Sequence, residues 1–216
     1  MRIVKDLPQH LPDGSANPEW LALRAGRFTG SDFVIMLGNG ETKRKMILEK
    51  ATEHILGKPC NKDHYTNSDM LRGIELEPIA RQLYIQETFN EVEEVGFIEK
   101  DEYCGCSPDG LVGDNGLIEI KCPKDTVFVE QKISGKIKQE YYVQIQYNLF
   151  ISDRKWCDYV AYNENFPLLI HRYYRDEEVI KKIKEALEDG IIKVKEIEYS
   201  FKGENNDSTN NIQQSI

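Results

Sequence analysis

The segment SPDGLVGDNGLIEIKCP, residues 107–123, constrains the fold of this 216-residue chain more than any other segment. Apolar residues stand on both sides of the turn sequence GDNG at 113–116. An Asn-Gly dipeptide tolerates the positive φ angles of tight hairpin turns. Pro123 ends the second strand, because proline cannot donate to a ladder. We therefore expect a β-hairpin, with Asp109 at the turn that precedes its first strand.

Two carboxylates and an ammonium group fall on this hairpin. Glu119 and Lys121 are two positions apart, so their side chains share one face of a strand, opposite Ile118 and Ile120. The hairpin returns Glu119 toward Asp109. Carboxylate pairs suit Mg²⁺ or Mn²⁺, and a nearby lysine can stabilise developing negative charge. Phosphodiester hydrolysis needs this set of groups, although such spacing occurs more often on solvated surface strands.

The rest of the chain predicts helices around a strand-rich centre, after an extended arm of about a dozen residues. Helices are expected over 18–26, 29–37, 46–55, 68–89, 139–151 and 177–197, and strands over 92–98, 103–107, 156–163 and 168–174. Thr29 or Ser31 is expected to cap the second helix, and Pro78 to kink or restart the fourth. Residues 128–138 fit no regular period and are expected to form a mobile loop.

The order of these elements indicates an α/β core with helices packed on a mixed sheet. One domain is expected over residues 1–202, followed by a disordered tail over 203–216. The net charge of −9 is not typical of a nucleic-acid binder, but a net charge averages over all faces of the protein surface. No run approaches the roughly 18 apolar residues of a membrane span, and no signal-peptide core is present. An intracellular location is expected.

The five cysteines are odd in number and irregularly spaced, which indicates reduced thiols. They contain no compact CxxC pair, so buried thiols are favoured over an iron–sulfur cluster. The four histidines show no paired metal-ligand spacing such as HExxH. Neither an iron–sulfur cluster nor a paired-histidine metal site is therefore indicated by this sequence.

The segment 107–123 resembles the active-site signature of the phage λ exonuclease and YqaJ-type viral recombinase family, a branch of the PD-(D/E)xK nucleases. Three further segments fit the same family in the same order: WLALRAGRFTGSDF (20–33), RGIELEPIARQLY (72–84) and YYVQIQYNLFIS (141–152). The likeness covers roughly residues 18–175. It implies a restriction-endonuclease-like core in which helices flank a mixed central β-sheet.

The resemblance implies a Mg²⁺-dependent 5′→3′ exonuclease acting on double-stranded DNA, with Mn²⁺ as a substitute. Processive loss of the 5′-ended strand would leave a 3′ overhang for single-strand-annealing recombination. The resemblance also implies a homotrimeric ring, a phage-type annealing protein as partner, and the cytoplasm of a bacterial host carrying a phage or prophage. Two alternatives stay open: a structure- or sequence-specific endonuclease of the same superfamily, and a non-catalytic DNA-binding recombination scaffold.

Matched position by position, the resemblance assigns roles within the hairpin. Asp109 and Glu119 match the metal ligands, and the carbonyl of Ile120 would be a further ligand. Lys121 matches the catalytic lysine. The presence of all three charged side chains counts against a scaffold that has lost its activity, because the loss of any one would be its expected mark.

Two helices carry further matches. Glu77 matches a glutamate near the metal site better than its neighbour Glu75 does. Gln144 matches an active-site glutamine better than Gln146 does, because the alignment around it is ungapped. Without the resemblance, these would be ordinary polar positions on amphipathic helices.

Two residues match positions that hold phosphate, and a third is a candidate. Arg24 and Ser31 match residues associated with the DNA 5′-phosphate, and Ser107 is a candidate for the scissile phosphate. Arginine presents a planar fork of donors to phosphate oxygens, and a helix start favours anions. Arg27 is a rival to Arg24. A Ser-Pro turn would explain Ser107 without any function.

Overall fold

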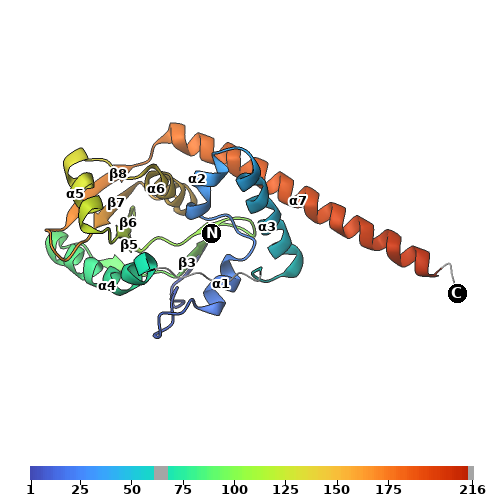
Figure 1. Ribbon diagram of the computed structural model, residues 1–216, viewed down its shortest axis with the longest axis horizontal. Coiled ribbons are helices and arrows are strands. Elements are labelled where there is room, and N and C mark those ends of the chain that lie inside the picture. The colour runs from blue at the N-terminus through green and yellow to red at the C-terminus, as the bar shows by residue number, and fades with distance from the viewer. Residues whose placement is uncertain (61–67, 214–216) are drawn as a thin grey trace.

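A five-stranded mixed sheet lies at the centre of the protein, with helices on both faces (Figure 1). The computed structural model describes the chain over residues 1–60 and 68–213, and its side chains over 1–60 and 68–203. The strand order is β2-β5-β6-β7-β8, and a smaller sheet has the order β1-β3-β4. The strands are β1 (Arg2–Val4), β2 (Val92–Glu93), β3 (Phe97–Glu99), β4 (Gly105–Cys106), β5 (Gly110–Val112), β6 (Gly116–Lys121), β7 (Trp156–Ala161) and β8 (Leu169–Tyr174).

The helices lie close to the predicted ranges in most cases. They are α1 (Pro18–Arg24), the 3-10 helix η1 (Gly30–Asp32), α2 (Phe33–Met36), α3 (Glu41–Leu56), α4 (Ser68–Thr88), α5 (Asp125–Ser134), α6 (Gln139–Ser152) and α7 (Glu177–Gln213). Pro78 stands inside α4, which continues through it. Thr29 rather than Ser31 caps η1, since Thr29 and Asp32 form a reciprocal capping box.

The predicted hairpin is confirmed. β5 and β6 pair antiparallel with Val112 opposite Gly116. The left-handed turn residue is Gly113, at φ +50°, rather than the Asn-Gly pair. Gly116 serves packing instead, because a Cβ there would lie 2.2 Å from the Trp156 ring. β6 then pairs parallel with β7, and α5 and α6 form the crossover that a parallel pair requires.

Both faces of β6 are covered. Ile118 and Ile120 pack with Ala80 and Tyr84 of α4 in one apolar cluster. Leu117 points the other way, into the larger cluster that α6 and α2 share. Glu119 lies on this second face and is only 1% exposed. The alternative of a solvated surface hairpin is therefore excluded.

Two predicted ranges are wrong. The strand expected over 92–98 is two strands in different sheets, β2 and β3, because Gly96 turns aside to donate its N–H to Val4 O at 2.9 Å. The loop expected over 128–138 begins as helix α5. Its β-branched residues hide a helical period, and packing decides instead: the Phe128 ring stacks on Phe166 at 5.1 Å.

The two ends of the chain extend the core. In the N-terminal arm, β1 pairs antiparallel with β3. α7 begins where predicted, continues past the expected end at Ile197, and projects away from the sheet (Figure 1). The single-domain boundary at 202 and a disordered tail after it stay predictions. Across residues 1–60 and 68–213, no helix is both long and apolar enough to span a membrane.

Candidate active site

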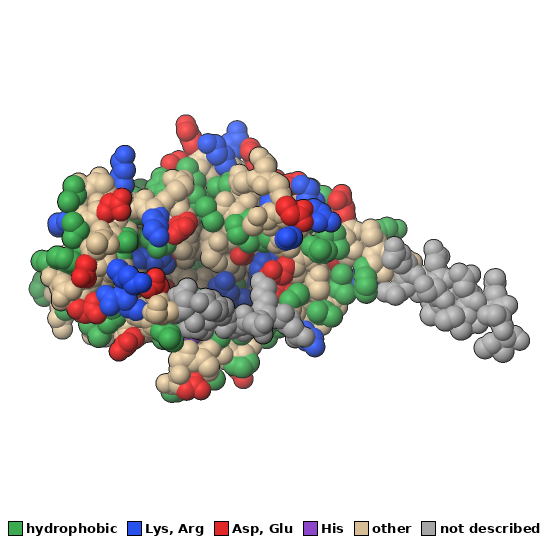
Figure 2. Space-filling view, in the orientation of Figure 1, with side chains coloured by type: hydrophobic (Ala, Val, Ile, Leu, Met, Phe, Trp, Pro, Cys, Tyr) green, Lys and Arg blue, Asp and Glu red, His purple; other side chains and the backbone are tan. Residues whose placement is uncertain are grey.

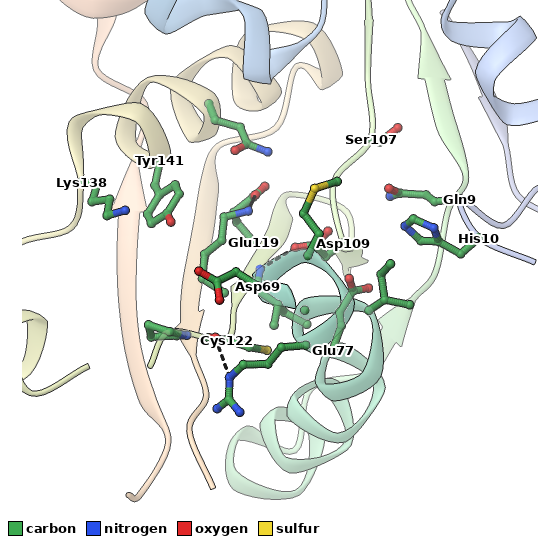
Figure 3. A pocket seen from close by; sticks show the side chains of 18 of the residues that line it. Gln9, His10, Asp69, Glu77, Ser107, Asp109, Glu119, Cys122, Lys138 and Tyr141 are labelled. Carbon is green, nitrogen blue, oxygen red and sulfur yellow. Dashed lines mark hydrogen bonds and ion pairs between the residues drawn. The ribbon is translucent and has the colours of Figure 1, made fainter. Parts of the chain in front are cut away.

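A cavity of about 510 Å³ opens where β6 meets α4, α6 and the N-terminal arm (Figure 3). Most of the predicted site residues line it, although they come from five separate segments of chain. Those that line it are Arg24, Glu77, Ser107, Asp109, Glu119, Ile120, Lys121 and Gln144. The fold thus brings together residues that span 120 positions of sequence, and this convergence marks the cavity as the candidate active site.

Asp109 is held in place by the strand that carries the other two charged residues. Its backbone N–H donates to Ile118 O at 3.2 Å. Its carboxylate Oδ2 accepts the backbone N–H of Ile120 at 2.6 Å. Because both contacts go to β6, the carboxylate is positioned relative to Glu119 and Lys121 by the hairpin itself.

Glu119 has a partner on each carboxylate oxygen. Oε1 contacts Lys121 Nζ at 2.5 Å, and Oε2 accepts Asn148 Nδ2 at 3.2 Å. Asn148 is buried on α6, one helical turn beyond Gln144. The sequence did not single out Asn148, but its i, i+4 spacing from Gln144 places both on one helix face. A metal at Glu119 would have to share Oε1 with Lys121 or displace its ammonium group.

The charges of the cavity shift one another's titration. Burial raises the pKa of Glu119 to about 7, and Lys121 opposes this shift. Burial and then the negative charge of Asp109 raise the pKa of Glu77 to about 8. Burial raises the pKa of Asp109 as well. Burial would lower the pKa of Lys121, but Glu119 and Asp109 together raise it. A raised pKa favours the protonated form of each carboxyl group, and a divalent cation would replace that proton.

Glu77 rather than Glu75 faces this cavity. Glu75 is exposed on the outer side of α4, whereas Glu77 lines the cavity and its carboxylate contacts Arg81. Arg81 also donates Nε to Asp109 O at 3.2 Å and pairs with Glu94 at 3.0 Å. Arg81 therefore joins the Glu77 side of the cavity to the Asp109 turn. The sequence did not single out Arg81, although its i, i+4 distance from Glu77 was a usable signal.

Gln144 and Gln146 have different surroundings. Gln144 lines the cavity. Gln146 is fully buried, donates Nε2 to Tyr174 O at 2.9 Å and accepts Asp176 N–H at 2.8 Å. Gly30 explains how η1 approaches this helix so closely, since a Cβ there would lie 2.9 Å from Gln144 Cγ. Gln144 is thus the glutamine available to a ligand.

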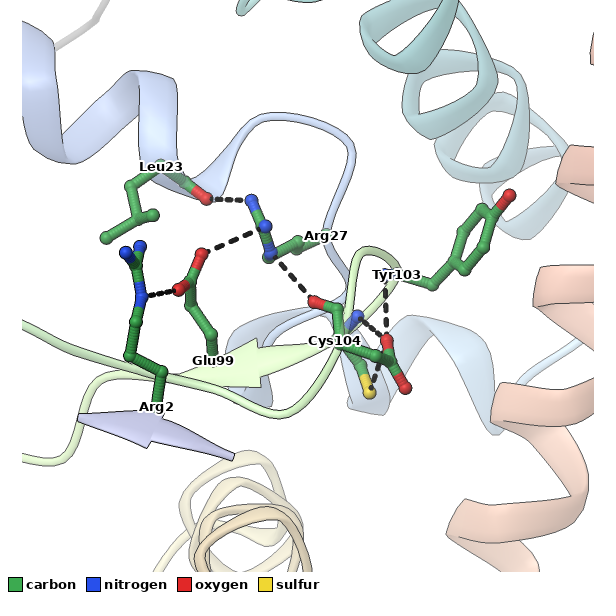
Figure 4. A network of polar contacts seen from close by, with 7 residues as sticks. Arg2, Leu23, Arg27, Glu99, Tyr103 and Cys104 are labelled. Carbon is green, nitrogen blue, oxygen red and sulfur yellow. Dashed lines mark hydrogen bonds and ion pairs between the residues drawn. The ribbon is translucent and has the colours of Figure 1, made fainter. Parts of the chain in front are cut away.

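Arg24 faces the cavity, and Arg27 faces away from it. The Arg24 guanidinium lies 4.4 Å from the centre of the Trp20 ring and donates to Thr29 Oγ1 at 3.0 Å. Arg27 pairs with Glu99 at 3.0 Å and donates to backbone carbonyls in the network of Figure 4. The donors of Arg27 are therefore used in contacts within the protein.

The two predicted serines lie in different places. Ser31 is exposed, its Oγ lies 3.3 Å from Thr29 Oγ1, and it is not among the described residues that line the cavity. Ser107 does line the cavity, but its Oγ donates to Gly96 O at 3.0 Å. A hydroxyl has one proton to give, so Ser107 in this rotamer offers a phosphate no donor.

The comparisons with known proteins decide the family. The YqaJ-like viral recombinase domain matches residues 19–155. This chain belongs to that family. An alkaline exonuclease from Laribacter hongkongensis, LHK-Exo, has 34% sequence identity and a TM-score of 0.80, covering 88% of this chain and 99% of its own. The same values hold for its structure in complex with dAMP.

A phage-related exonuclease from Haemophilus somnus shares the fold, with a TM-score of 0.61, 16% identity, and coverage of 81% of this chain and 96% of its own. Among curated proteins none matches this chain. The predicted family, fold class and exonuclease class of enzyme are confirmed by these likenesses.

The donor set of this YqaJ-like domain fits a hard divalent cation. Within the described parts of the chain, no group of three or more His, Cys, Asp and Glu side chains is placed to hold a metal. Mg²⁺ is commonly held by only one or two carboxylates, with water and substrate phosphate completing its shell. Asp109 and Glu119, with the carbonyl of Ile120, are the groups that would hold it.

The rim of the cavity in this YqaJ-like domain carries cations with acidic partners. The pairs are Arg72–Glu164, Lys124–Asp69 at 2.5 Å and Lys138–Glu140 at 3.6 Å. The sequence did not single out Tyr141, whose ring centre lies 5.3 Å from Lys121 Nζ and 5.5 Å from Lys138 Nζ. Acidic and basic side chains are interspersed over the face shown in Figure 2. The net charge of −9 is therefore compatible with phosphate contacts at this rim.

Proposed function

We propose that this YqaJ-like domain is a Mg²⁺-dependent 5′→3′ exonuclease that processively degrades the 5′-ended strand of duplex DNA. The single observation that carries the proposal is that Asp109, Glu119 and Lys121 share one cavity with Arg24. Two carboxylates and an ammonium group supply hydrolysis, and the arginine supplies a fork for a terminal phosphate. The product would be a 3′ overhang for strand annealing.

Bound Mg²⁺ would polarise the scissile phosphate and activate a water molecule. Asp109 and Glu119 would orient that ion, the first through its bond to Ile120 N–H and the second through Asn148. Lys121 stays protonated because its neighbours raise its pKa, so Nζ can stabilise the charge that develops on the phosphate oxygens. Glu77, with a pKa near 8, can release or accept a proton near neutral pH.

The proposed polarity depends on Arg24. Its guanidinium lies over the Trp20 ring, and the side chain lines the cavity. Stacking on an aromatic ring leaves the planar edge free for bidentate contact with phosphate. A 5′-terminal phosphate carries more charge than an internal one, so such a pocket favours 5′ ends.

Digestion of end-labelled linear duplex, with and without Mg²⁺, tests this function. Mononucleotides should appear only with Mg²⁺, and a 5′ label should be released before a 3′ label. Covalently closed circles should survive. Free cutting of circles would instead support an endonuclease of the same superfamily, and intact linear duplex under all conditions would reject both enzymes.

We further propose a homotrimeric ring around the DNA, a phage-type single-strand annealing protein as partner, and action in the cytoplasm of a bacterial host. The resemblance to the λ exonuclease family supports these three statements. Light scattering at micromolar concentration should give three times the mass of one 25.0 kDa chain. A stable monomer would contradict the ring.

A further inference from the structure

The N-terminal arm forms a wall of the active-site cavity. Gln9 and His10 line it, on the side of Asp109 and Glu77 and across from Tyr141 (Figure 3). The same two arm residues line a second cavity of about 380 Å³, which also borders Glu77 and Asp109. His10 thus lines two cavities at the candidate metal centre, and none of the roles described above uses it.

Asn17 holds the arm at the two residues that precede His10. Its Nδ2 donates to Pro8 O at 2.9 Å, and its backbone N–H donates to Gln9 O at 2.9 Å. Its Oδ1 accepts Glu19 N–H at 3.0 Å and so caps α1. One buried side chain therefore ties His10 to the helix that carries Arg24.

Gly96 joins the arm to the rest of the phosphate side of the cavity. Its N–H donates to Val4 O at 2.9 Å, and its carbonyl accepts Trp20 Nε1 at 2.9 Å and Ser107 Oγ at 3.0 Å. A Cβ on this glycine would lie 2.0 Å from Leu7 O. The arm, the Trp20 ring under Arg24 and the Ser107 turn are thus all hydrogen-bonded to this one residue.

The His10 ring has no hydrogen-bond partner among the described residues, and its Nδ1 is buried. Burial lowers the pKa of His10, which favours the neutral ring with one N–H. An N–H that is buried without an acceptor is costly, so the proton is better placed on Nε2. That nitrogen is the one a ligand in either cavity can reach.

The geometry points to His10 as a substrate-binding residue, which donates Nε2–H to a non-bridging phosphate oxygen of the DNA strand. The Ser107 hydroxyl donates its only proton to Gly96 O, so the donors that this wall offers a ligand are those of Arg24, Gln9 and His10. A preorganised neutral donor beside a cation is a usual arrangement for phosphate. The ligand's identity as DNA depends on the proposed function, whereas the unpartnered, rigidly held donor does not.

Two substitutions at one position test this assignment. His10→Phe keeps an aromatic ring and removes both nitrogens, whereas His10→Gln returns an N–H donor near the place of Nε2. Binding of a fluorescent blunt duplex is measured by anisotropy without divalent cations, so that cleavage does not interfere. We expect about tenfold weaker binding for His10→Phe and near wild-type binding for His10→Gln. His171→Phe, on β8 and outside the lining of this cavity, is the control.

The duplex is used with a 5′-phosphate and with a 5′-hydroxyl. A loss confined to the phosphorylated duplex places His10 on the terminal phosphate, and an equal loss with both duplexes places it on an internal one; both support the assignment. Wild-type binding by His10→Phe, or an equal loss in both variants at unchanged urea midpoints, would overturn it. Binding is measured without cleavage. A protein that binds DNA but fails to cut it would therefore reject the proposed function, while the effect of the His10 variants on binding could still be interpreted.

Discussion

The backbone N–H of Ile120 donates a 2.6 Å hydrogen bond to Asp109 Oδ2. One carboxylate of the candidate metal centre is therefore held by the strand that carries the other. Arg81 holds the same turn from the opposite side, through its bond to the Asp109 carbonyl. The Asp109 carboxylate is thus positioned by a backbone donor of β6, whereas the Glu119 carboxylate is held by the side chains of Lys121 and Asn148.

Asp109→Asn should remove the negative charge of this side chain without moving it. The amide oxygen can still accept the Ile120 N–H, so the urea midpoint should stay close to that of the wild type. The loss of one negative ligand should lower the cleavage rate about a hundredfold or more. Nucleotide release at saturating Mg²⁺ measures the effect. Asp114→Asn, on the exposed hairpin turn, is the matched control, and equal activity in the two variants would remove Asp109 from the site.

Asn148→Ala should act on metal affinity through Glu119. The variant removes the donor to Oε2, and groups that orient a ligand in this way typically contribute 10- to 100-fold, so we expect about a tenfold rise in the Mg²⁺ concentration needed for half-maximal cleavage. Excess Mg²⁺ should restore much of the rate. A variant whose activity falls without any change in Mg²⁺ dependence would show that Asn148 does not act through the metal. Asn115→Ala, on the exposed turn, is the control.

The local sequence was enough to predict the hairpin, α4 and α6, because each element contains its own turn residues or its own 3.6-residue apolar period. The assignment of Glu119 and Lys121 to one face followed from the two-residue period of strands. Their burial did not follow, since it depends on α6 packing over that face. The choice of Glu77 over Glu75 came from the resemblance, and the structure agrees in placing Glu77 at the cavity.

Contacts between distant segments could not be predicted from the sequence. Asn148 is 29 positions from Glu119, and Ser107 donates to a peptide 11 positions away. Gly96 could be recognised as a strand break only when its three partners were known. Neither the arm's place beside Asp109 nor the committed proton of Ser107 is visible in spacing or composition, because both depend on how the small sheet packs against α1.

Arg24→Lys and Arg27→Lys should have opposite consequences. Arg24→Lys loses the planar fork over Trp20, so preference for a 5′-phosphorylated end should fall about tenfold with little change in stability. Arg27→Lys weakens its contacts with Glu99 and two backbone carbonyls, which should cost about 1 kcal/mol of unfolding free energy. Competition between phosphorylated and hydroxyl duplex ends, with urea unfolding alongside, separates the two. The reverse pattern would assign the 5′ end to Arg27.

The raised pKa of Glu119 should make stability fall as pH rises when no divalent cation is present. Its ordinary value is 4.5 and its value in the fold is about 7, so between these limits the folded protein binds more protons than the unfolded chain. Unfolding free energy attributable to this group is therefore full below about pH 4.5 and lost as pH passes 7. Urea unfolding in EDTA should show this slope, and Glu119→Gln should reduce it. Mg²⁺ should restore stability most at high pH, because it replaces the proton. An identical slope in wild type and Glu119→Gln would mean that Glu119 does not titrate in this range.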